Sequence, residues 1–164
     1  MKKVSLISRC SVAVVLALSS TLTYADDMLF TGSLINPAPC VISGGNTIDV
    51  PFGENLGVKK IDGINYIQTV PYSVACETVS SSLELGLTIV SASVTTFDPS
   101  AIQTNIPDLG IRILRNGVPL TLNTRIAYDK NNPPTLQAVP VQATGATLSE
   151  GAFEATATLL VDYQ

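Results

Sequence analysis

The 164-residue sequence contains no histidine and no tryptophan. Without histidine there is no imidazole to act as a general base, to complete a Ser–His–Asp triad or to bind a metal ion. Charged residues make up only 13% of the chain, and no calcium-binding loop or glycine-rich phosphate loop is present. These absences argue against an enzyme, a metal centre and a bound cofactor.

Long apolar runs are also missing. The run from Ser11 to Leu18 is too short to span a membrane, which takes about 20 apolar residues. It follows three basic residues and leads to the small residues Thr23 and Ala25. This order is typical of a secretory signal peptide. We therefore predict that residues 1–25 are a signal peptide and that the remaining chain is exported.

Positive charge is scarce after the predicted signal peptide. That part of the chain has six basic and thirteen acidic residues, which gives a formal net charge of −7. Nucleic acids and anionic membranes are bound by clustered lysine and arginine, and the sequence has no such cluster. Nucleic acid is therefore not an expected partner.

Of the three cysteines, Cys10 lies in the predicted signal peptide, so that Cys40 and Cys76 remain. A pair of cysteines in an exported protein predicts a disulfide. Two isolated thiols without histidine cannot build a zinc site. In the chain-entropy model, closing a loop of this length contributes about 4 kcal/mol to stability.

The exported part is rich in Val, Ile, Thr and Leu, and short apolar runs alternate with turn residues. The predicted strands are 28–35, 40–43, 47–52, 66–76, 83–94, a hairpin over 111–122 with its turn at Asn116-Gly117, 136–141 and 153–163. The predicted loops are 53–63, 98–108 and 129–135. Many short strands with one disulfide indicate an all-β, antiparallel sandwich.

The last predicted strand follows Gly151 and has an apolar residue at every second position. These residues are Phe153, Ala155, Ala157, Leu159, Val161 and Tyr163. A period of two is the pattern of a strand with one buried face. The backbone on the open side of such a strand needs a partner.

Two terminal patterns resemble those of a protein family. One is Gly151 followed by the alternating residues up to the penultimate Tyr163. The other is Phe30 to Ile35 followed by Pro39-Cys40, and residues 48–53 and 136–141 are weaker matches. With these patterns the chain resembles a pilin subunit of the chaperone–usher fimbriae of Gram-negative bacteria.

The resemblance implies an incomplete immunoglobulin-like β-sandwich that lacks its last strand. Residues 26–36 would be an N-terminal donor-strand extension and residues 37–164 the pilin domain. A periplasmic chaperone lends such a subunit a strand, which the extension of a neighbouring subunit later replaces. The implied donor residues are Met28, Phe30, Gly32 and Leu34. The implied acceptor residues are Gly151, Phe153, Ala155, Ala157, Leu159, Val161, Tyr163 and Gln164.

The implied function is that of a structural, non-enzymatic fimbrial subunit of minor or tip-adaptor type that supports cell adhesion. The implied partners are a periplasmic chaperone, an outer-membrane usher and neighbouring subunits. The subunit would be exported through the periplasm to a fimbrium on the cell surface. Alternatives are a major shaft pilin, a single-domain adhesin that binds a receptor, and a free-standing immunoglobulin-like domain. Periodicity alone also permits 26–35 and 153–163 to be the domain's own first and last strands, with Tyr163 an ordinary aromatic residue.

Overall fold

The structure is a computed structural model that describes residues 28–34, 39–77 and 84–163. The chain divides into two units, Met1–Leu34 and Ile35–Gln164. The predicted signal peptide, Ile35 and Gln164 lie outside the described residues. In the first unit, residues 28–34 form neither helix nor strand, and their side chains are exposed.

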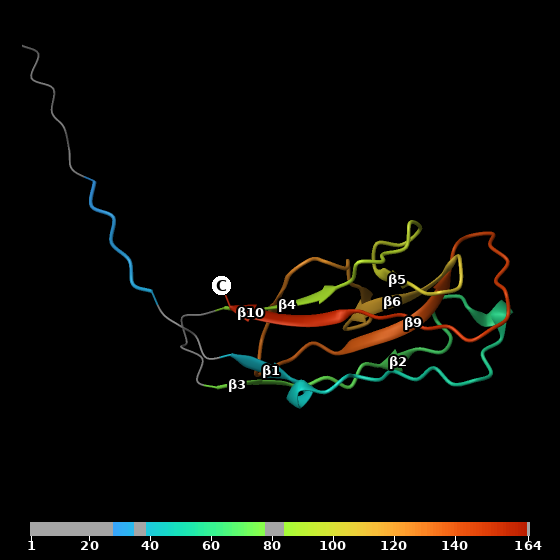
Figure 1. Cartoon of the computed structure of the whole chain (residues 1–164), viewed down its shortest axis with the longest axis horizontal. Helices are drawn as coiled ribbons and strands as arrows, with labels where there is room; N and C mark the ends of the chain where they lie inside the picture. The colour runs from blue at the N-terminus through green and yellow to red at the C-terminus, as the bar shows by residue number, and fades with distance from the viewer. Residues whose placement is uncertain (1–27, 35–38, 78–83, 164) are drawn as a thin grey trace, which may run out of the picture. The chain divides into compact units, whose positions relative to one another are not determined.

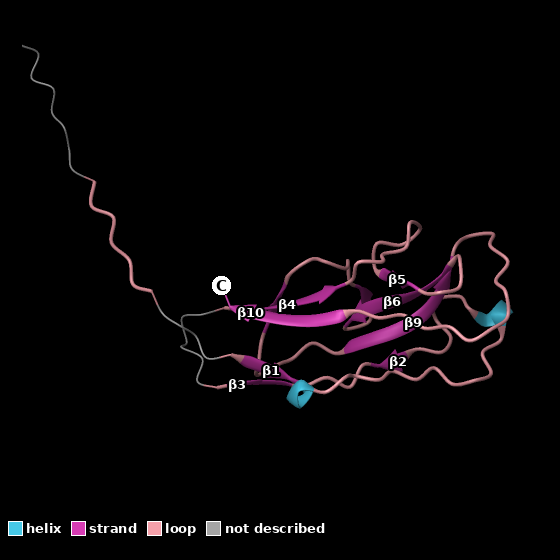
Figure 2. Cartoon of the chain, viewed as in Figure 1, coloured by secondary structure: helices cyan, strands magenta, loops and turns pink. Residues whose placement is uncertain are grey.

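The second unit consists of short strands joined by turns and loops (Figure 2). Its described part has ten strands and two 3-10 turns, η1 at Ser43–Gly45 and η2 at Val58–Lys60. The strands are β1 (Cys40–Ile42), β2 (Gln68–Thr69), β3 (Val74–Cys76), β4 (Leu85–Val90), β5 (Ala101–Gln103), β6 (Leu109–Arg115), β7 (Val118–Pro119), β8 (Ile126–Tyr128), β9 (Leu136–Gln142) and β10 (Thr158–Tyr163).

The strands form three antiparallel sheets (Figure 1). One has the order β2-β9-β6-β5, with β7 also paired to β6, the second has the order β10-β4-β8, and the third is the pair β1-β3. Every ladder is antiparallel. The predicted all-β class is therefore confirmed.

The core joins the two larger sheets, because one cluster of buried side chains draws on both. Leu85, Leu87 and Ile89 of β4 pack with residues of β6 and β9 such as Ile113 and Leu136. These are the residues that the apolar alternation places on the inner face of each strand. The predicted alternation along β4 is therefore confirmed.

The structure contains the predicted disulfide between Cys40 and Cys76. The two residues face each other in the ladder between β1 and β3. The predicted hairpin is also confirmed, because β6 and β7 flank a turn in which Asn116 and Gly117 have φ of 50° and 80°. Asparagine and glycine are the residues that best tolerate this left-handed backbone.

Several predicted strands are wrong in extent or absent. Residues 28–34 form no strand, and the predicted strand 83–94 ends at Val90. Residues 47–52 do not form a strand, because among the described residues they have no backbone partner. The predicted strand 66–76 is interrupted at Pro71, whose nitrogen cannot donate to a ladder, and appears as β2 and β3. The last strand begins at Thr158 instead of Phe153.

Two strands were not predicted. β5 lies within the predicted loop 98–108, where Ala101 and Ile102 are buried against the core and pair with β6. β8 is only three residues long and pairs with β4. Strands this short carry less than two periods of alternation, so the pattern is too weak to predict them.

An ion pair crosses the outer face of the β10-β4-β8 sheet above a glycine. The Nε of Arg125 donates to Asp162 Oδ1 over 2.7 Å. Gly86 of β4 is paired with Asp162, and a Cβ at this glycine would overlap the Arg125 guanidinium. Glycine is therefore the residue that lets arginine reach across the central strand.

We expect Gly86→Ala to lower the free energy of unfolding by about 1 kcal/mol, because it displaces the guanidinium from a partly exposed ion pair. Chemical denaturation of the folded subunit measures the change. In an Arg125→Ala background the same substitution is expected to be neutral or stabilising, since alanine is favoured over glycine within a strand. An equal loss of stability in both backgrounds would contradict this explanation.

Candidate functional site

Among the described residues, one side of β10 has no partner strand. β10 pairs with β4 from Thr158 opposite Val90 to Tyr163 opposite Leu85. Within the described part of the chain, no strand pairs with the other side of β10, which is therefore an edge of its sheet (Figure 1). A sheet edge presents a row of backbone N–H and C=O groups to any strand that can pair with it.

The inner face of β10 is poorly covered compared with that of β4. Leu159 and Val161 of β10 are paired with Ile89 and Leu87 of β4, and paired residues point to the same face. The exposed fraction is 0% for Leu87 and 7% for Ile89, whereas Leu159 and Val161 are only half-buried. The core is thus closed above β4 and still open above β10.

Residues 47–56 form a second segment without pairing. Val50 and Phe52 are half-buried and alternate with the exposed Asp49 and Pro51, as in a strand. No backbone–backbone hydrogen bond joins residues 47–56 to any other described residue. The segment therefore has the side-chain pattern of a strand but not its ladder.

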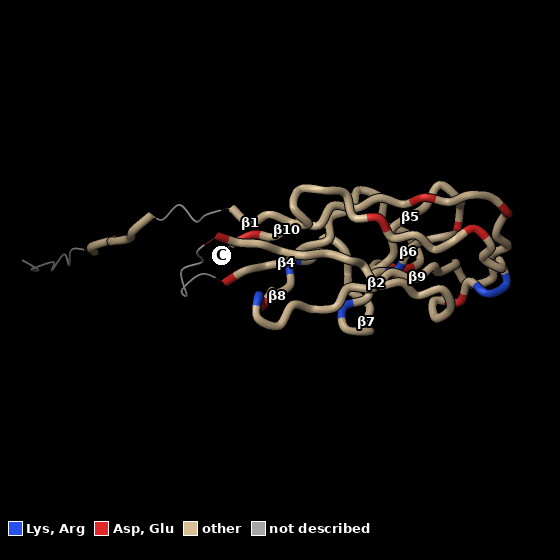
Figure 3. Tube along the Cα trace, turned by 90° about the horizontal axis from the view of Figure 1, so that it is seen from below, with Lys and Arg blue, Asp and Glu red and all other residues tan. Residues whose placement is uncertain are grey.

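The stretch from β1 to the unpaired segment, residues 40–52, touches the last segment of the chain near both of its ends. The rings of Phe52 and Phe153 have centroids 5.9 Å apart. Near the other end, the Tyr163 hydroxyl donates to Cys40 Sγ over 3.2 Å, and β1 and β10 lie at the same end of the unit (Figures 1 and 3). The two segments therefore run in opposite directions.

Between these two contacts lies a set of half-buried apolar side chains packed against the main core. We call this set the open edge, and its members are Val50, Phe52, Phe153, Ala155, Leu159 and Val161. All six are uncharged, and the acidic residues of the same segments, such as Asp49, Glu154 and Asp162, occupy the alternate positions. The open edge can therefore bind an extended apolar segment through backbone hydrogen bonds and burial, rather than through ion pairs.

Five of the eight predicted acceptor residues lie along this edge. Phe153, Ala155, Leu159, Val161 and Tyr163 are half-buried. Ala157 is exposed, Gly151 is exposed with a φ of 150°, and Gln164 lies outside the described residues.

The predicted donor residues belong to the other unit. Met28, Phe30 and Leu34 have exposed fractions of 79%, 86% and 103%, and Gly32 is also exposed. Their role as donors stays a prediction.

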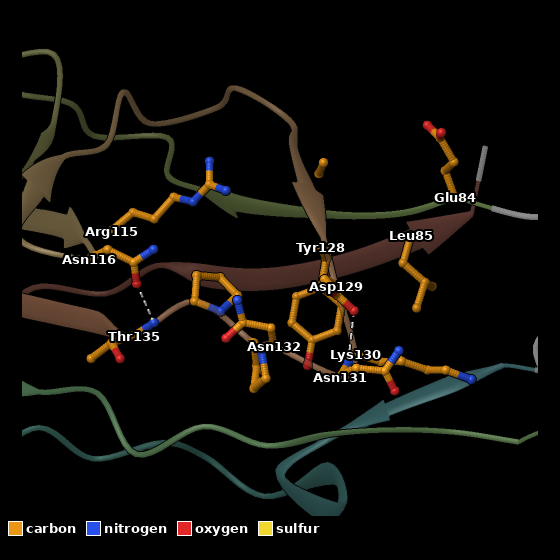
Figure 4. Close-up of a pocket in the computed structure, with 13 residues that line it drawn as sticks. Glu84, Leu85, Arg115, Asn116, Tyr128, Asp129, Lys130, Asn131, Asn132 and Thr135 are labelled. Atoms are coloured by element: carbon orange, nitrogen blue, oxygen red, sulfur yellow. Dashed lines mark hydrogen bonds between the residues drawn. The ribbon is translucent and has the colours of Figure 1, made fainter.

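A pocket of about 760 Å³ lies apart from the open edge (Figure 4). It is formed by the beginning of β4, the end of β6, and the chain from Ala127 to Thr135. The sequence predicts 129–135 only as a loop and does not predict the pocket, because the pocket depends on residues brought together from distant segments. The dense run of asparagine and proline at 131–134 was the one local signal.

The loop above this pocket is fixed by hydrogen bonds. The Tyr72 hydroxyl donates to the Pro134 carbonyl over 2.6 Å. Burial, with a smaller contribution from Tyr128, raises the pKa of Tyr72 to about 12, although Arg115 lowers it. Burial and then Asp129 raise the pKa of Tyr128. Both hydroxyls are thus protonated at neutral pH, and Tyr72 remains a donor to the loop.

The described residues contain neither a metal-binding cluster nor a membrane-spanning helix. No group of three or more Cys, Asp or Glu side chains there is arranged to hold a metal ion. None of the helices in the described residues has the length and apolar character needed to cross a membrane.

Comparison with known proteins gives concordant results. A family model described as "Fimbrial protein" matches residues 28–164. The fimbrial-like protein YfcQ of Escherichia coli K12 is 38% identical over 155 residues, which cover 91% of this chain and 95% of YfcQ. The fimbrial-like protein YfcR of the same strain is 38% identical over 133 residues, covering 78% and 75% of the two chains.

Solved structures show the same fold. The P pilus adaptor subunit PapF is 25% identical, with a TM-score of 0.60 over 79% of this chain and 98% of PapF. The P pilus rod subunit PapA is 21% identical, with a TM-score of 0.56 over 84% of this chain and 100% of PapA, a likeness of fold alone. The predicted immunoglobulin-like pilin fold is confirmed. The chain belongs to the fimbrial protein family and is a pilin subunit of the chaperone–usher type.

Proposed function

We propose that this pilin is a structural, non-enzymatic subunit that is built into a fimbrium by donor-strand exchange. The open edge would first accept a strand from a periplasmic chaperone and then the N-terminal extension of a neighbouring subunit. The observation that carries the proposal is the contrast in burial between paired strands: Leu87 of β4 is fully buried, whereas its partner Val161 of β10 is half-buried.

An inserted strand would meet two needs of the open edge at once. It would pair with the backbone on the free side of β10, where hydrogen bonding is otherwise left to water. Its inward side chains would cover Leu159 and Val161, and each Å² of apolar surface removed from water contributes about 25 cal/mol. An edge left bare would promote aggregation, and a strand lent by a chaperone would prevent this before assembly.

The N-terminal segment has the chemistry of the missing strand. Met28, Phe30 and Leu34 occupy alternate positions and are exposed, so their apolar surface is available to a partner. Gly32 has no side chain and would suit a point where two backbones approach closely. We assign residues 26–36 to this extension and residues 37–164 to the pilin domain.

The role within the fimbrium is proposed as that of a minor or tip-adaptor subunit that supports cell adhesion. PapF, whose structure is similar, is an adaptor subunit of the P pilus. A major shaft pilin and a single-domain adhesin are the alternatives. In each case the subunit would pass through the periplasm and an outer-membrane usher to the cell surface. Tyr163 and Gln164 would take part in recognition by the chaperone.

The test is co-expression with a pilus chaperone, and two neighbouring leucines provide a matched pair. Leu159 faces the core, whereas Leu160 points outward with an exposed fraction of 45%. We expect the unaltered subunit to be purified from the periplasm as a one-to-one complex. Leu159→Asp should lower the yield of this complex at least tenfold, because a carboxylate would be buried under the inserted strand.

Leu160→Asp is the control and should be captured normally. Leu159→Ala keeps the inner face of β10 apolar, and it should give an intermediate yield of the chaperone complex. An intermediate yield indicates a weakened edge on a subunit that still folds. Capture of Leu159→Asp and Leu160→Asp to the same extent would be incompatible with strand insertion at the open edge.

A further inference from the structure

We propose that the pocket formed by β4, β6 and the 129–135 loop binds a neutral saccharide. None of the residues that line it belongs to the open edge, so an inserted strand at that edge would not occupy this pocket. Its volume of about 760 Å³ falls within the range of small-ligand sites, which is about 300–1,000 Å³.

The pocket combines an apolar floor with a polar rim. Leu85 and Tyr128 have exposed fractions of 5% and 7% and form the floor together with Pro134. In the view of Figure 4, the ring of Tyr128 lies between Leu85 and Asn132. A sugar ring has apolar C–H faces and a periphery of hydroxyl groups, and it matches such a surface.

Several polar side chains on the rim are available to a ligand. Arg115, Lys130, Asn131, Asn132 and Thr135 line the pocket and make no side-chain hydrogen bond or ion pair with another described residue. Asparagine amides both donate and accept, as sugar hydroxyl groups do. The rim can therefore bind a ligand that needs donors and acceptors side by side.

The charges on the rim cancel, which selects the class of ligand. Arg115 and Lys130 are balanced by Glu84 and Asp129, so the pocket has no net formal charge. A site for phosphate, sulfate or a sialic acid would have an excess of positive charge. An uncharged polyol is the ligand that this balance favours.

The rim is preorganised for binding. Asp129 Oδ1 accepts from Asn131 N over 2.8 Å, and Asn116 Oδ1 accepts from Thr135 N over 2.9 Å (Figure 4). Pro133 and Pro134 restrict the backbone between these two anchors. A ligand would therefore not have to order this loop, which lowers the entropic cost of binding.

The experiment uses the mature subunit purified with its chaperone, or the intact fimbria that contain it. An array of neutral oligosaccharides, with sialylated and sulfated counterparts and free amino acids, identifies a ligand, and saturation-transfer NMR measures its affinity. We expect a neutral member to bind with a Kd below about 10 mM, and the affinity to be unaffected by added salt.

The informative variant is Asn131→Ala combined with Asn132→Ala, which leaves the backbone anchors of the loop intact. It should weaken saccharide binding at least tenfold with unchanged thermal unfolding and chaperone capture. Asn55→Ala, at an exposed asparagine outside the pocket, is the control and should bind normally. No binding of any neutral member, binding of charged members only, or undiminished binding by the double variant would each overturn the proposal.

Discussion

Deletion of Asp26 to Leu34 is expected to remove the subunit from fimbriae while its capture by the chaperone remains intact. The deleted segment contains the exposed apolar residues Met28, Phe30 and Leu34. In the proposed mechanism these side chains fill the open edge of the neighbouring subunit. The truncated subunit could still accept a strand, but it would have no extension to donate to the preceding subunit.

Immunoelectron microscopy of fimbriae and purification of the periplasmic complex measure the two outcomes separately. Point variants refine the result, because Phe30→Asp should reproduce most of the deletion, whereas Thr31→Ala, at the intervening position, should assemble normally. If the truncated subunit were still found in fimbriae, residues 26–34 would not be the donor strand.

Replacement of Cys40 and Cys76 by alanine is expected to lower the free energy of unfolding by about 4 kcal/mol. The disulfide closes a loop with a sequence separation of 36 residues, and the chain-entropy model gives a cost of this size for its loss. A small domain has a total stability of about 5–15 kcal/mol. The yield of subunit in the periplasm should therefore fall several-fold or more.

The cost of losing this disulfide has a second source in the structure. β1 and β3 pair only over three residues, and Cys40 also accepts a hydrogen bond from Tyr163 at the end of the open edge. Chemical denaturation measures the free energy of unfolding of the subunit, both in complex with its chaperone and after release from it. Each measurement is made with and without a reducing agent. A loss of less than about 1 kcal/mol would mean that the disulfide does not hold the β1–β3 pair together.

The parts of the fold that could be predicted depend on neighbouring residues in the sequence. The Asn116-Gly117 hairpin needs only the backbone preferences of two residues, and the buried face of β4 follows from simple alternation. The disulfide followed from two cysteines in an exported chain. None of these features requires knowledge of distant contacts.

The features that could not be predicted depend on partners. Residues 47–52 and 153–157 alternate like strands, yet neither segment forms a ladder among the described residues: 47–52 has no backbone–backbone hydrogen bond there, and 153–157 has a single one, from Asn105 N to the Glu154 carbonyl. Propensity indicates that a segment can form a strand, and only tertiary or intermolecular pairing decides whether it does. In the proposed mechanism that pairing comes from another molecule.

The two candidate sites differ in the same way. Four of the six residues of the open edge lie in the predicted periodic segment 153–163. The other two, Val50 and Phe52, were not predicted as part of the site, because they come from a segment distant in the sequence. The pocket joins Glu84, Arg115 and Asn131, which lie far apart in the sequence and share no motif. Only the packing of β4, β6 and the 129–135 loop brings them together.

The most direct test is hydrogen–deuterium exchange of the subunit lacking Asp26 to Leu34, measured alone and with a synthetic peptide of residues 26–36. We predict that amides of β10 and of residues 47–56 exchange quickly in the free subunit and become strongly protected when the peptide binds. A peptide with Phe30→Asp should protect them much less. Protection of β10 equal to that of β9 without any peptide, and unchanged by its addition, would contradict the claim that this fold is completed by a strand from another molecule.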